Sequence, residues 1–309
     1  MNIDMSNWSG RTDPETNSPR WHQRVQPLTG SAAPGTALVG FCSDEGVRRN
    51  KGRTGAAGGP AAMRRALGPL AWHQSAPAYD AGDVVCRGED LDGAHRALAE
   101  RVAQMLASGH FPIVMGGGHE VAFGSWSGLA QHLETQDECP RIGIINFDAH
   151  FDLRDPQFVV SSGTPFAQIA NACEQKGWPF AYACLGVSRA ANTQALFERA
   201  GQLNVLVRED RAMTAAALPA LVEDLNDFMA GCDHLYLTVD IDVFPAAQAP
   251  GVSAPAPRGV GLEVIEPLIE HIRASGKLRL ADLAELNPEY DVDGHTARLA
   301  ARLIHTLTL

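Results

Sequence analysis

The sequence predicts an α/β fold in which helices cover both faces of a parallel sheet. Two observations predict it. Short runs that are apolar throughout alternate along the chain with longer segments of helical apolar spacing. Strands that are apolar on both faces are typical of a parallel sheet buried between helices. The 309 residues show neither an internal repeat nor a mid-chain linker, so one large domain is expected.

The expected strands are short apolar runs that end at polar or glycine-rich segments. They cover residues 36–42, 111–115, 141–147, 181–187, 203–207, 234–241 and 278–284, and residues 79–85 are a weaker eighth. The expected helices show apolar residues three and four apart and cover residues 59–67, 90–108, 214–231 and 295–309. Pro60 supports the first of them, because a proline near a helix N-terminus sacrifices no hydrogen bond.

The N-terminal segment differs from the rest. Residues 1–35 are rich in Ser, Pro, Gly, Thr and Asn, which predicts an irregular arm that precedes a single domain over residues 36–309. The polar start predicts no signal peptide, and no apolar run is long enough to span a bilayer. Six cysteines without a C-x-x-C pair are expected to be reduced, which favours a cytoplasmic protein.

Charge limits the choice of partners. The formal net charge is -11, which argues against nucleic acid and against a basic membrane-surface helix. An acidic excess is common in cytosolic proteins and says little else about partners, so the expectation of a small-molecule partner rests on the motifs below.

Side chains that bind metals gather where three expected strands end. The stretch "NFDAHFDLR" places Asp148, His150 and Asp152 two residues apart, and side chains with that spacing point the same way in extended backbone. Asp240 and Asp242 follow another strand, and His119 follows three glycines. Ligands bind at the carboxyl ends of strands in open α/β sheets, so these six residues are expected to meet there.

The chemistry of these six residues predicts a metal centre. Each motif alone also fits a solvated turn or a structural histidine. Together, four carboxylates at one sheet edge would repel one another unless cations neutralised them. Carboxylates and imidazoles without cysteine favour Mn²⁺ over structural Zn²⁺, and six ligands fit two ions that share bridging carboxylates.

The motifs "GGGHE", "NFDAHFD", "VDIDVF" and "LAELNPEYD" resemble, in order and spacing, those of the ureohydrolase superfamily of arginases and agmatinases. Over residues 36–309 the chain is most similar to the formimidoylglutamase branch. The resemblance implies a three-layer α/β/α fold with a doubly wound parallel sheet of about eight strands. It also implies two manganese ions per subunit and hydrolysis at an amidine or guanidine carbon.

Ligand roles follow from the resemblance residue by residue. One ion would take His119, Asp148, Asp152 and Asp240, and the other would take Asp148, His150, Asp240 and Asp242. Asp148 and Asp240 would bridge. Glu285 matches the position that orients the reacting nitrogen, although a surface or helix-capping glutamate is the alternative.

One departure concerns the proton source. Many relatives have histidine in H-G-T-P-F, whereas this chain reads "SSGTPF", with Ser162 in that place. A serine hydroxyl can relay a proton or bind substrate but does not titrate near neutrality. Metal-bridging water and Asp148 are the remaining candidates for the proton source.

Substrate choice is predicted from a second departure. Where arginases place acidic residues for a substrate ammonium, this chain has "SRAANT", with Arg189 and Asn192. Arginine pairs with carboxylates in a forked geometry, which suits a substrate that carries two carboxylates. Basic residues after the first strand extend the expected positive rim, unless they form a solvated loop: Arg48, Arg49, Lys51 and Arg53.

The expected activity is hydrolysis of N-formimidoyl-L-glutamate to L-glutamate and formamide, a step of histidine degradation. The alternatives are a ureohydrolase that releases urea from a guanidino acid or amine, a non-catalytic metal-binding relative and a deacetylase-like relative. The resemblance also implies a homo-oligomer, a trimer or a hexamer.

Overall fold

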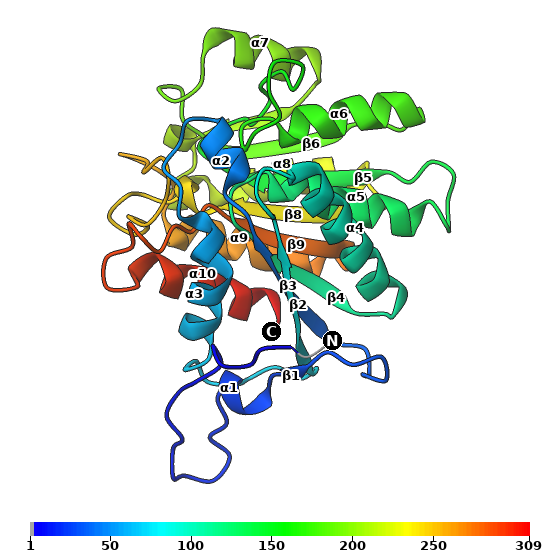
Figure 1. Ribbon diagram of the computed structural model, residues 1–309. Coiled ribbons are helices and arrows are strands. Elements are labelled where there is room, and N and C mark those ends of the chain that lie inside the picture. The colour runs from blue at the N-terminus through cyan, green and yellow to red at the C-terminus, as the bar shows by residue number, and fades with distance from the viewer. Residues whose placement is uncertain (1–2) are drawn as a thin grey trace.

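The structure is a computed structural model that describes residues 3–309. A nine-stranded sheet runs through the molecule, with every pairing parallel, in the order β1-β3-β2-β4-β9-β8-β5-β6-β7 (Figure 1). The strands are β1 Gln26–Pro27, β2 Thr36–Cys42, β3 Ala78–Val85, β4 Phe111–Met115, β5 Ile142–Phe147, β6 Ala181–Val187, β7 Leu206–Glu209, β8 His234–Asp240 and β9 Leu278–Ala284.

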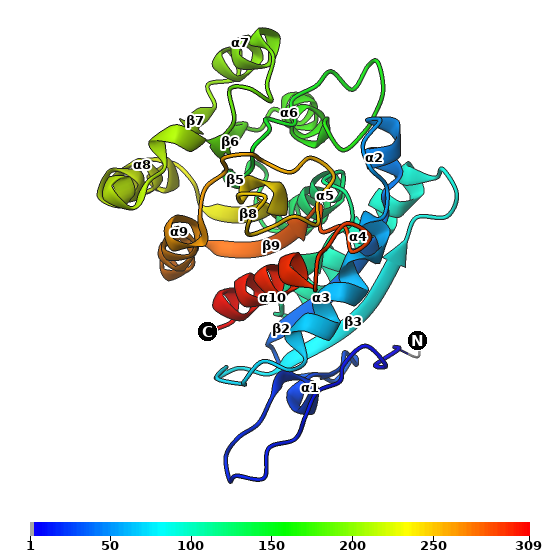
Figure 2. The same cartoon turned by 90° about the vertical axis from the view of Figure 1, so that its left-hand side faces the viewer.

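Helices cover both faces of this sheet. They are α1 Trp21–Arg24, α2 Glu45–Arg49, α3 Gly59–Leu67, α4 Leu91–Ala107, α5 Val121–Leu133, α6 Pro165–Lys176, α7 Gln194–Gln202, α8 Leu218–Ala230, α9 Leu262–Ala274 and α10 His295–Leu307. Figure 2 shows α8, α9 and α10 on one side of the sheet and α4, α5 and α6 on the other. The predicted parallel three-layer α/β/α fold is confirmed.

Successive side chains along the strands alternate between two apolar cores, one on each face of the sheet. Within β8, Leu235, Leu237 and Val239 pack into the core under α8, α9 and α10, whereas Tyr236 packs into the core under α4, α5 and α6. Successive strand side chains point to opposite faces, so a strand buried on both sides must be apolar throughout. The uninterrupted apolar runs in the sequence have this cause.

The predicted element bounds hold for most of the chain, and the seventh strand is displaced. It was expected at residues 203–207, but α7 continues to Gln202 and its C-cap is Leu203. Asn204 then adopts φ 52°, a left-handed conformation that Asn tolerates, and the strand starts only at Leu206. The strand therefore extends to Glu209, two residues beyond the predicted end.

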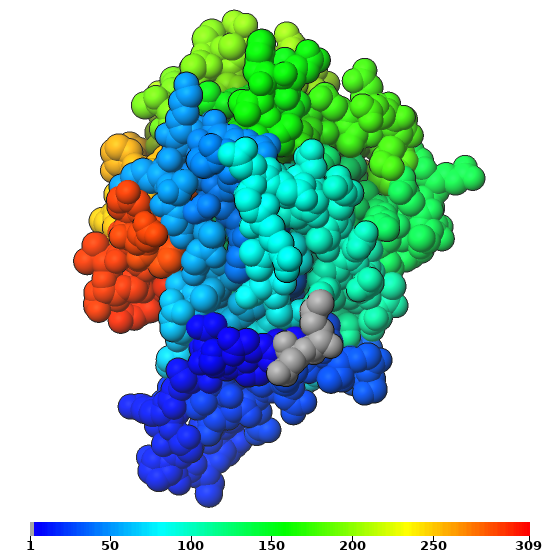
Figure 3. Space-filling model, in the orientation of Figure 1, coloured from blue at the N-terminus to red at the C-terminus, as the bar shows by residue number. Residues whose placement is uncertain are grey.

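The N-terminal segment contains more structure than expected. It includes α1, and β1 extends the sheet as a partner of β3. Trp21 is fully buried against Trp72, and the indole N–H of Trp8 donates to Asp80 at 2.6 Å. Figure 3 shows this segment in dark blue across the lower part of the molecule. A domain boundary at residue 36 stays a prediction.

Within residues 3–309 no helix combines the length and the apolar character needed to cross a membrane.

Candidate metal centre and active site

The candidate site lies where four adjacent strands end. β4, β9, β8 and β5 are neighbours in the sheet, and their carboxyl ends lead directly into the four motifs. His119 follows β4, Glu285 follows β9, Asp240 ends β8, and Asp148 follows β5. The parallel sheet therefore brings together side chains that lie up to 166 positions apart in the chain.

Glycine is required in the loop that carries His119. A Cβ on Gly117 would lie 1.7 Å from the carbonyl oxygen of Ser43, so no other residue fits without a shift of the backbone. Gly118 donates its N–H to the same carbonyl at 2.9 Å. The loop after β4 thus packs directly on the loop after β2, which fixes the height of His119 above the sheet.

Three carboxylates surround one imidazole nitrogen. His119 Nδ1 lies 3.0 Å from Asp148 Oδ2, 3.0 Å from Asp152 Oδ2 and 3.2 Å from Asp240 Oδ2. One nitrogen can donate only one proton, and within residues 3–309 none of these contacts gives Nδ1 a hydrogen bond of good geometry. A divalent cation among these four atoms would satisfy all of them.

A second group shares Asp148 with the first. His150 Nδ1 lies 3.2 Å from Asp242 Oδ2 and 3.5 Å from Asp148 Oδ1. Ligand atoms of Asp148, His150 and Asp242 all lie within 4.8 Å of one another, as do those of the first group. Asp240 lies in the first group and not in the second, so the sharing of Asp240 that the resemblance implies stays a prediction. Its Oδ1 accepts the backbone N–H of Asp242 at 2.8 Å.

Hydrogen bonds aim the shared carboxylate. Asn146 lies two residues earlier on the same face of β5 and donates from Nδ2 to Asp148 Oδ2 at 3.0 Å. The other oxygen, Oδ1, accepts the backbone N–H of His150 at 2.7 Å. Asn146 and Asp148 are fully buried, so the Asp148 carboxylate has no competing contact with bulk water. Such fixed orientation is what a bridging metal ligand requires.

The charged groups of the cluster shift one another's pKa values. Burial, Asp242 and Asp148 raise the pKa of the Asp240 carboxyl well above its usual value, and burial and Asp148 raise the pKa of Asp152. Asp242, against the effect of burial, raises the pKa of the His150 imidazole well above its usual value. A bound divalent cation would favour the ionised carboxylates and the neutral imidazoles. The donor set therefore fits metal ions of the hard-to-borderline kind.

Backbone strain concentrates at the same place. Asp152 adopts φ 48°, Glu285 φ 67° and Lys51 φ 62°, a left-handed region that residues with a Cβ rarely occupy. Within the described chain these are three of only six non-glycine residues with positive φ. Strained residues cluster at functional sites, where the surrounding structure holds them in place.

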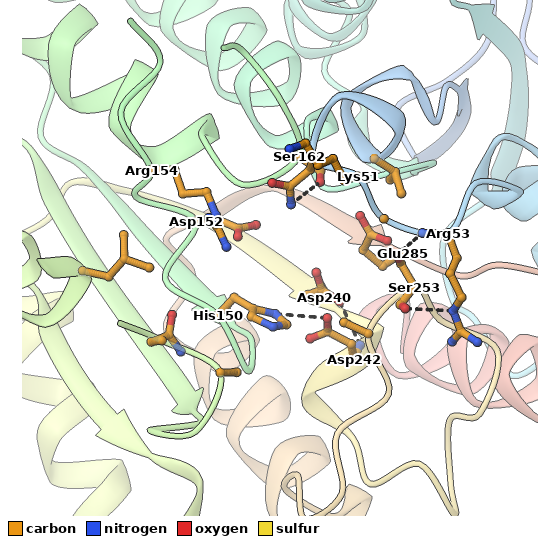
Figure 4. A pocket seen from close by; sticks show the side chains of 17 residues that line it. Lys51, Arg53, His150, Asp152, Arg154, Ser162, Asp240, Asp242, Ser253 and Glu285 are labelled. Carbon is orange, nitrogen blue, oxygen red and sulfur yellow. Dashed lines mark hydrogen bonds and ion pairs between the residues drawn. The ribbon is translucent and has the colours of Figure 1, made fainter. Parts of the chain in front are cut away.

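A cavity of about 310 Å³ opens onto these ligands. Figure 4 shows the side chains of His150, Asp152, Asp240, Asp242 and Glu285 around one space. Its volume lies at the lower end of the range for small-molecule sites. The remaining lining residues are Val47, Asn50, Lys51, Gly52, Arg53, Arg154, Ser162, Ala191, Asn192, Leu196, Ser253 and Ala254.

Glu285 lies at the bottom of the cavity, 5% exposed. Its Oε1 accepts the backbone N–H of His119 at 2.9 Å. Burial and the nearby Glu120 carboxylate raise the pKa of Glu285 to about 8. A carboxylate in this environment favours a cationic partner strongly, because a positive charge would relieve both effects.

Three of the four predicted substrate-binding residues border the cavity. Ser162 accepts a hydrogen bond from Asn50 Nδ2 at 3.3 Å. Asn192 is buried, and its side chain bonds to backbone atoms of the loop, including the N–H of Phe151 at 3.1 Å. Arg53 donates to the carbonyl groups of Ser253 and Val252 and lies over the ring of Tyr290.

Arg189 lies elsewhere. Its guanidinium forms a two-contact ion pair with Glu209 and stacks on Phe197, and its side chain is 58% exposed. It does not line the cavity. Two of the four basic residues after β2 also point away from it, because Arg48 and Arg49 both pair with Glu45.

Sequence reasoning missed Arg154. This residue lines the cavity, and within residues 3–309 its guanidinium has neither a hydrogen bond nor an ion pair. Figure 4 places Arg154 on one side of the space and Arg53 on the opposite side. The available signal was its place in the motif, because Arg154 stands two residues after Asp152 in "NFDAHFDLR".

Fold and site together define a class of protein. A model described as "Arginase family" matches residues 34–309, and the chain belongs to that family. Among curated proteins, the chain is similar to the formimidoylglutamase of Aeromonas hydrophila, at 64% identity over 99% of this chain and 98% of that protein. The formimidoylglutamase of Chromobacterium violaceum is 52% identical, again over 99% of this chain and 98% of the relative.

Solved structures share the fold. Formimidoylglutamase from Bacillus subtilis superposes with a TM-score of 0.83 at 22% identity, covering 97% of this chain and 94% of that one. Trypanosoma cruzi formiminoglutamase with Mn²⁺ gives a TM-score of 0.82 at 25% identity, covering 94% and 98%. The second of these neighbours contains manganese.

Proposed function

We propose that the chain is a manganese-dependent hydrolase that converts N-formimidoyl-L-glutamate and water to L-glutamate and formamide. The observation that carries this proposal is the pair of ligand groups that share Asp148 beneath a cavity with unpaired cations. Full-length relatives named formimidoylglutamase, at up to 64% identity, support the choice of substrate.

The six predicted ligands would hold two Mn²⁺ ions per subunit. The first ion would be held by His119, Asp148, Asp152 and Asp240, and the second by Asp148, His150 and Asp242. The resemblance assigns Asp240 to the second ion as well, and its Oδ1 accepts the Asp242 N–H. Bound manganese would supply the activation of water as a nucleophile.

Glu285 would bind the amidinium of the substrate. Its Oε1 is anchored on the His119 backbone, whereas within residues 3–309 Oε2 has no hydrogen-bond partner. A carboxylate oriented in this way can accept the amidinium N–H groups and hold the formimidoyl carbon next to the metal ligands. Pairing with the cation would also keep Glu285 ionised near neutral pH.

Cations at the cavity would bind the two carboxylates of the substrate. Arg154 and Lys51 have no side-chain partner within residues 3–309, so their charges are available to an anion. Arg53 uses its Nε–H and one terminal nitrogen on the carbonyl groups of Ser253 and Val252 and adds positive charge. Arg189 would take part only if its pair with Glu209 opened, and Asn192 would act by shaping the loop.

The leaving α-nitrogen needs a proton when the C–N bond breaks. Ser162 borders the cavity and its hydroxyl can relay a proton. Water at the metal centre and Asp148 are the other candidates. Against the effect of burial, His119 and His150 hold the pKa of the Asp148 carboxyl below its usual range, so Asp148 would pass on a proton and not store one. Asp148 would then combine metal binding with a catalytic role.

The proposal is tested by loading the purified protein with manganese and assaying four substrates in parallel. These are N-formimidoyl-L-glutamate, arginine, agmatine and guanidinobutyrate, with formamide and urea measured separately. We expect formamide from the first substrate and no urea from the others. Urea release would favour a ureohydrolase acting on a guanidino compound, and no product at all would favour a metal-binding relative without catalysis. The Asp148→Asn variant provides the inactive control.

A cytoplasmic location and a trimeric or hexameric assembly remain proposals. Fractionation of cells and light scattering of the purified protein would test them.

A further inference from the structure

A fully buried carboxylate lies under the metal ligands and takes no part in the proposed reaction. Asp282 is in the middle of β9 with 0% exposure, covered by α5 on the side that it faces. Burial raises the pKa of its carboxyl, whereas the hydroxyl groups of Thr238, Tyr236 and Ser125 lower it. Charged groups are rarely buried so deeply without a specific use.

The pairing register of β8 and β9 places the Asp282 carboxylate beside a residue that contacts a proposed metal ligand. Asp282 on β9 pairs with Thr238 on β8. Thr238 Oγ1 lies 3.0 Å from His119 Nε2. His119, Thr238 and Asp282 thus form a buried row that starts at the first ligand group and ends inside the sheet.

Proton positions along this row follow from counting donors. If Thr238 Oγ1 accepts the Nε2–H of His119, the hydroxyl proton of Thr238 remains to be donated. Within residues 3–309, Asp282 Oδ1 is a buried acceptor without a hydrogen-bond partner. The other oxygen, Oδ2, already accepts the hydroxyl of Tyr236 at 2.5 Å. A small shift of the Thr238 side chain toward Oδ1 would complete both groups at once, and the Thr238 hydroxyl is already close enough to lower the pKa of the Asp282 carboxyl.

We propose that Asp282 is a positioning residue for the metal centre. Through Thr238 it fixes the neutral tautomer of His119 with the proton on Nε2, and Nδ1 is left unprotonated toward Asp148, Asp152 and Asp240. Imidazole ligands of metals are commonly oriented by a second hydrogen bond of this kind, with a carboxylate as a frequent partner. Here the carboxylate acts through an intervening hydroxyl.

A purely structural role does not account for the charge of Asp282. Support of Tyr236 needs one acceptor oxygen, which an asparagine would supply. Two acceptor oxygens are needed only if a second donor is bound as well. The hydroxyls of Thr238 and of Ser125 on α5 are both close to the carboxylate, and Thr238 is the one that is paired in register with Asp282 and also contacts His119. The proposal therefore predicts different results for variants that are nearly equal in size.

Four variants distinguish an effect of the hydrogen-bonded row of His119, Thr238 and Asp282 from an effect on side-chain packing. Asp282→Asn replaces one acceptor oxygen by an amide donor, and Thr238→Val removes the intermediate hydroxyl without a large change in volume. Thr238→Ser restores that hydroxyl. Tyr236→Phe is the matched control, because it removes the other hydrogen bond of Asp282 and leaves the row to His119 intact.

Manganese affinity of the metal-free protein is the first readout, measured by EPR during titration with Mn²⁺. We expect Asp282→Asn and Thr238→Val each to weaken the tighter site by about 10- to 100-fold. Thr238→Ser and Tyr236→Phe should stay within about threefold of the unaltered chain, a difference below 1 kcal/mol. The double variant Thr238→Val/Asp282→Asn should bind manganese no more weakly than Thr238→Val alone, because the two residues act in series.

The tautomer of His119 in the metal-free protein is the second readout. Long-range ¹H–¹⁵N NMR distinguishes a proton on Nε2 from one on Nδ1, and the His119→Asn variant assigns the signal. Against the effect of burial, contacts with Asp148, Asp152 and Asp240 raise the pKa of the His119 imidazole in the metal-free protein, so the spectra are recorded at a pH above that pKa, where the ring is neutral. There we expect the Nε2–H form in the unaltered chain and a mixture in Thr238→Val and Asp282→Asn. Denaturation curves of each variant show whether it is folded.

Two results would overturn the proposal. One is unchanged manganese affinity and an unchanged His119 tautomer in Asp282→Asn. The other is an equal loss of affinity in Tyr236→Phe, which would assign the effect to packing. The inference rests on the proposed metal centre, and the unaltered chain tests that part separately. If it binds no manganese, the proposed function fails; if it binds manganese and Asp282→Asn binds equally well, only this inference fails.

Discussion

Glu285 and His119 are joined by a hydrogen bond of 2.9 Å, in which Oε1 of the carboxylate accepts the backbone N–H of the histidine. The bond links the residue after β9 to the loop after β4, and so links the proposed substrate anchor to the first metal ligand. Because one oxygen is held in this way, the position of Glu285 relative to the ligands does not depend on the substrate. Oε2 remains for the amidinium.

Glu285→Gln tests this division of roles. The amide oxygen can still accept the His119 N–H, but the side chain loses the charge that would pair with an amidinium. We expect kcat/KM for N-formimidoyl-L-glutamate to fall by about 10²- to 10⁴-fold. Manganese content, measured by elemental analysis after dialysis, should be unchanged. Turnover near that of the unaltered chain would show that Glu285 does not contact the reacting nitrogen.

Asp148→Asn tests the shared ligand. Asp148 is the one residue that belongs to both ligand groups found among residues 3–309, so loss of its charge should weaken the binding of both proposed ions. We expect activity to fall by orders of magnitude and bound manganese to fall below two ions per chain. The control is Asp155→Asn, a loss of the same charge in the loop that follows β5.

The variant should remain folded, because the two apolar cores form without the ligands. Circular dichroism before and after manganese addition would establish this. Normal turnover in Asp148→Asn at saturating manganese would contradict the bridging assignment, as would a stoichiometry of one ion in a fully active unaltered chain.

The gathering of the six predicted metal ligands could be expected from the sequence because each lies at or soon after the end of a strand. Parallel strands end at one edge of the sheet. Within the first motif the expected extended backbone is not found, because the chain bends at Ala149 and His150, and Asp152 adopts φ 48°. The side chains of Asp148, His150 and Asp152 still gather at this edge. Glu285 followed for the same reason, since it comes directly after β9. The order β4-β9-β8-β5 in the sheet brings the motifs together.

Long-range pairing could not be predicted in the same way. Arg189 was expected to meet substrate, but Glu209 at the end of β7 holds it. Val187 pairs with Glu209 across β6 and β7, which places the carboxylate beside the loop that carries Arg189. The predicted strand ended at residue 207, two residues too early, and so did not include Glu209, the partner of this arginine.

The pH dependence of stability is expected to include a contribution from His95. This histidine is 4% exposed and packs between the rings of Phe41 and Phe123. Burial lowers its pKa from 6.5 to about 4. The folded protein therefore disfavours the proton that the unfolded chain accepts, so the stabilisation is complete above pH 6.5 and is lost as the pH falls toward 4.

A pKa difference of that size between the folded and the unfolded chain corresponds to roughly 3 kcal/mol in the free energy of unfolding. Urea denaturation of the metal-free protein at several pH values would measure it, with His95→Leu as the comparison. The variant lacks the titrating group, so the free energy of unfolding should fall less steeply with acid than in the unaltered chain. A constant difference between the two proteins from pH 7 to pH 4 would assign no titration to His95.

Arg154→Ala and Arg189→Ala, studied together, locate the site of carboxylate recognition. Arg154 borders the cavity without a partner among residues 3–309, so its loss should reduce kcat/KM by an amount equal to roughly 2–5 kcal/mol. Arg154→Lys should recover part of this, because an ammonium keeps the charge but not the forked contact. Arg189→Ala should change kcat/KM little, since its exposed guanidinium is bound to Glu209. A large loss in Arg189→Ala with normal turnover in Arg154→Ala would reverse the assignment and require the Glu209 pair to open when substrate binds.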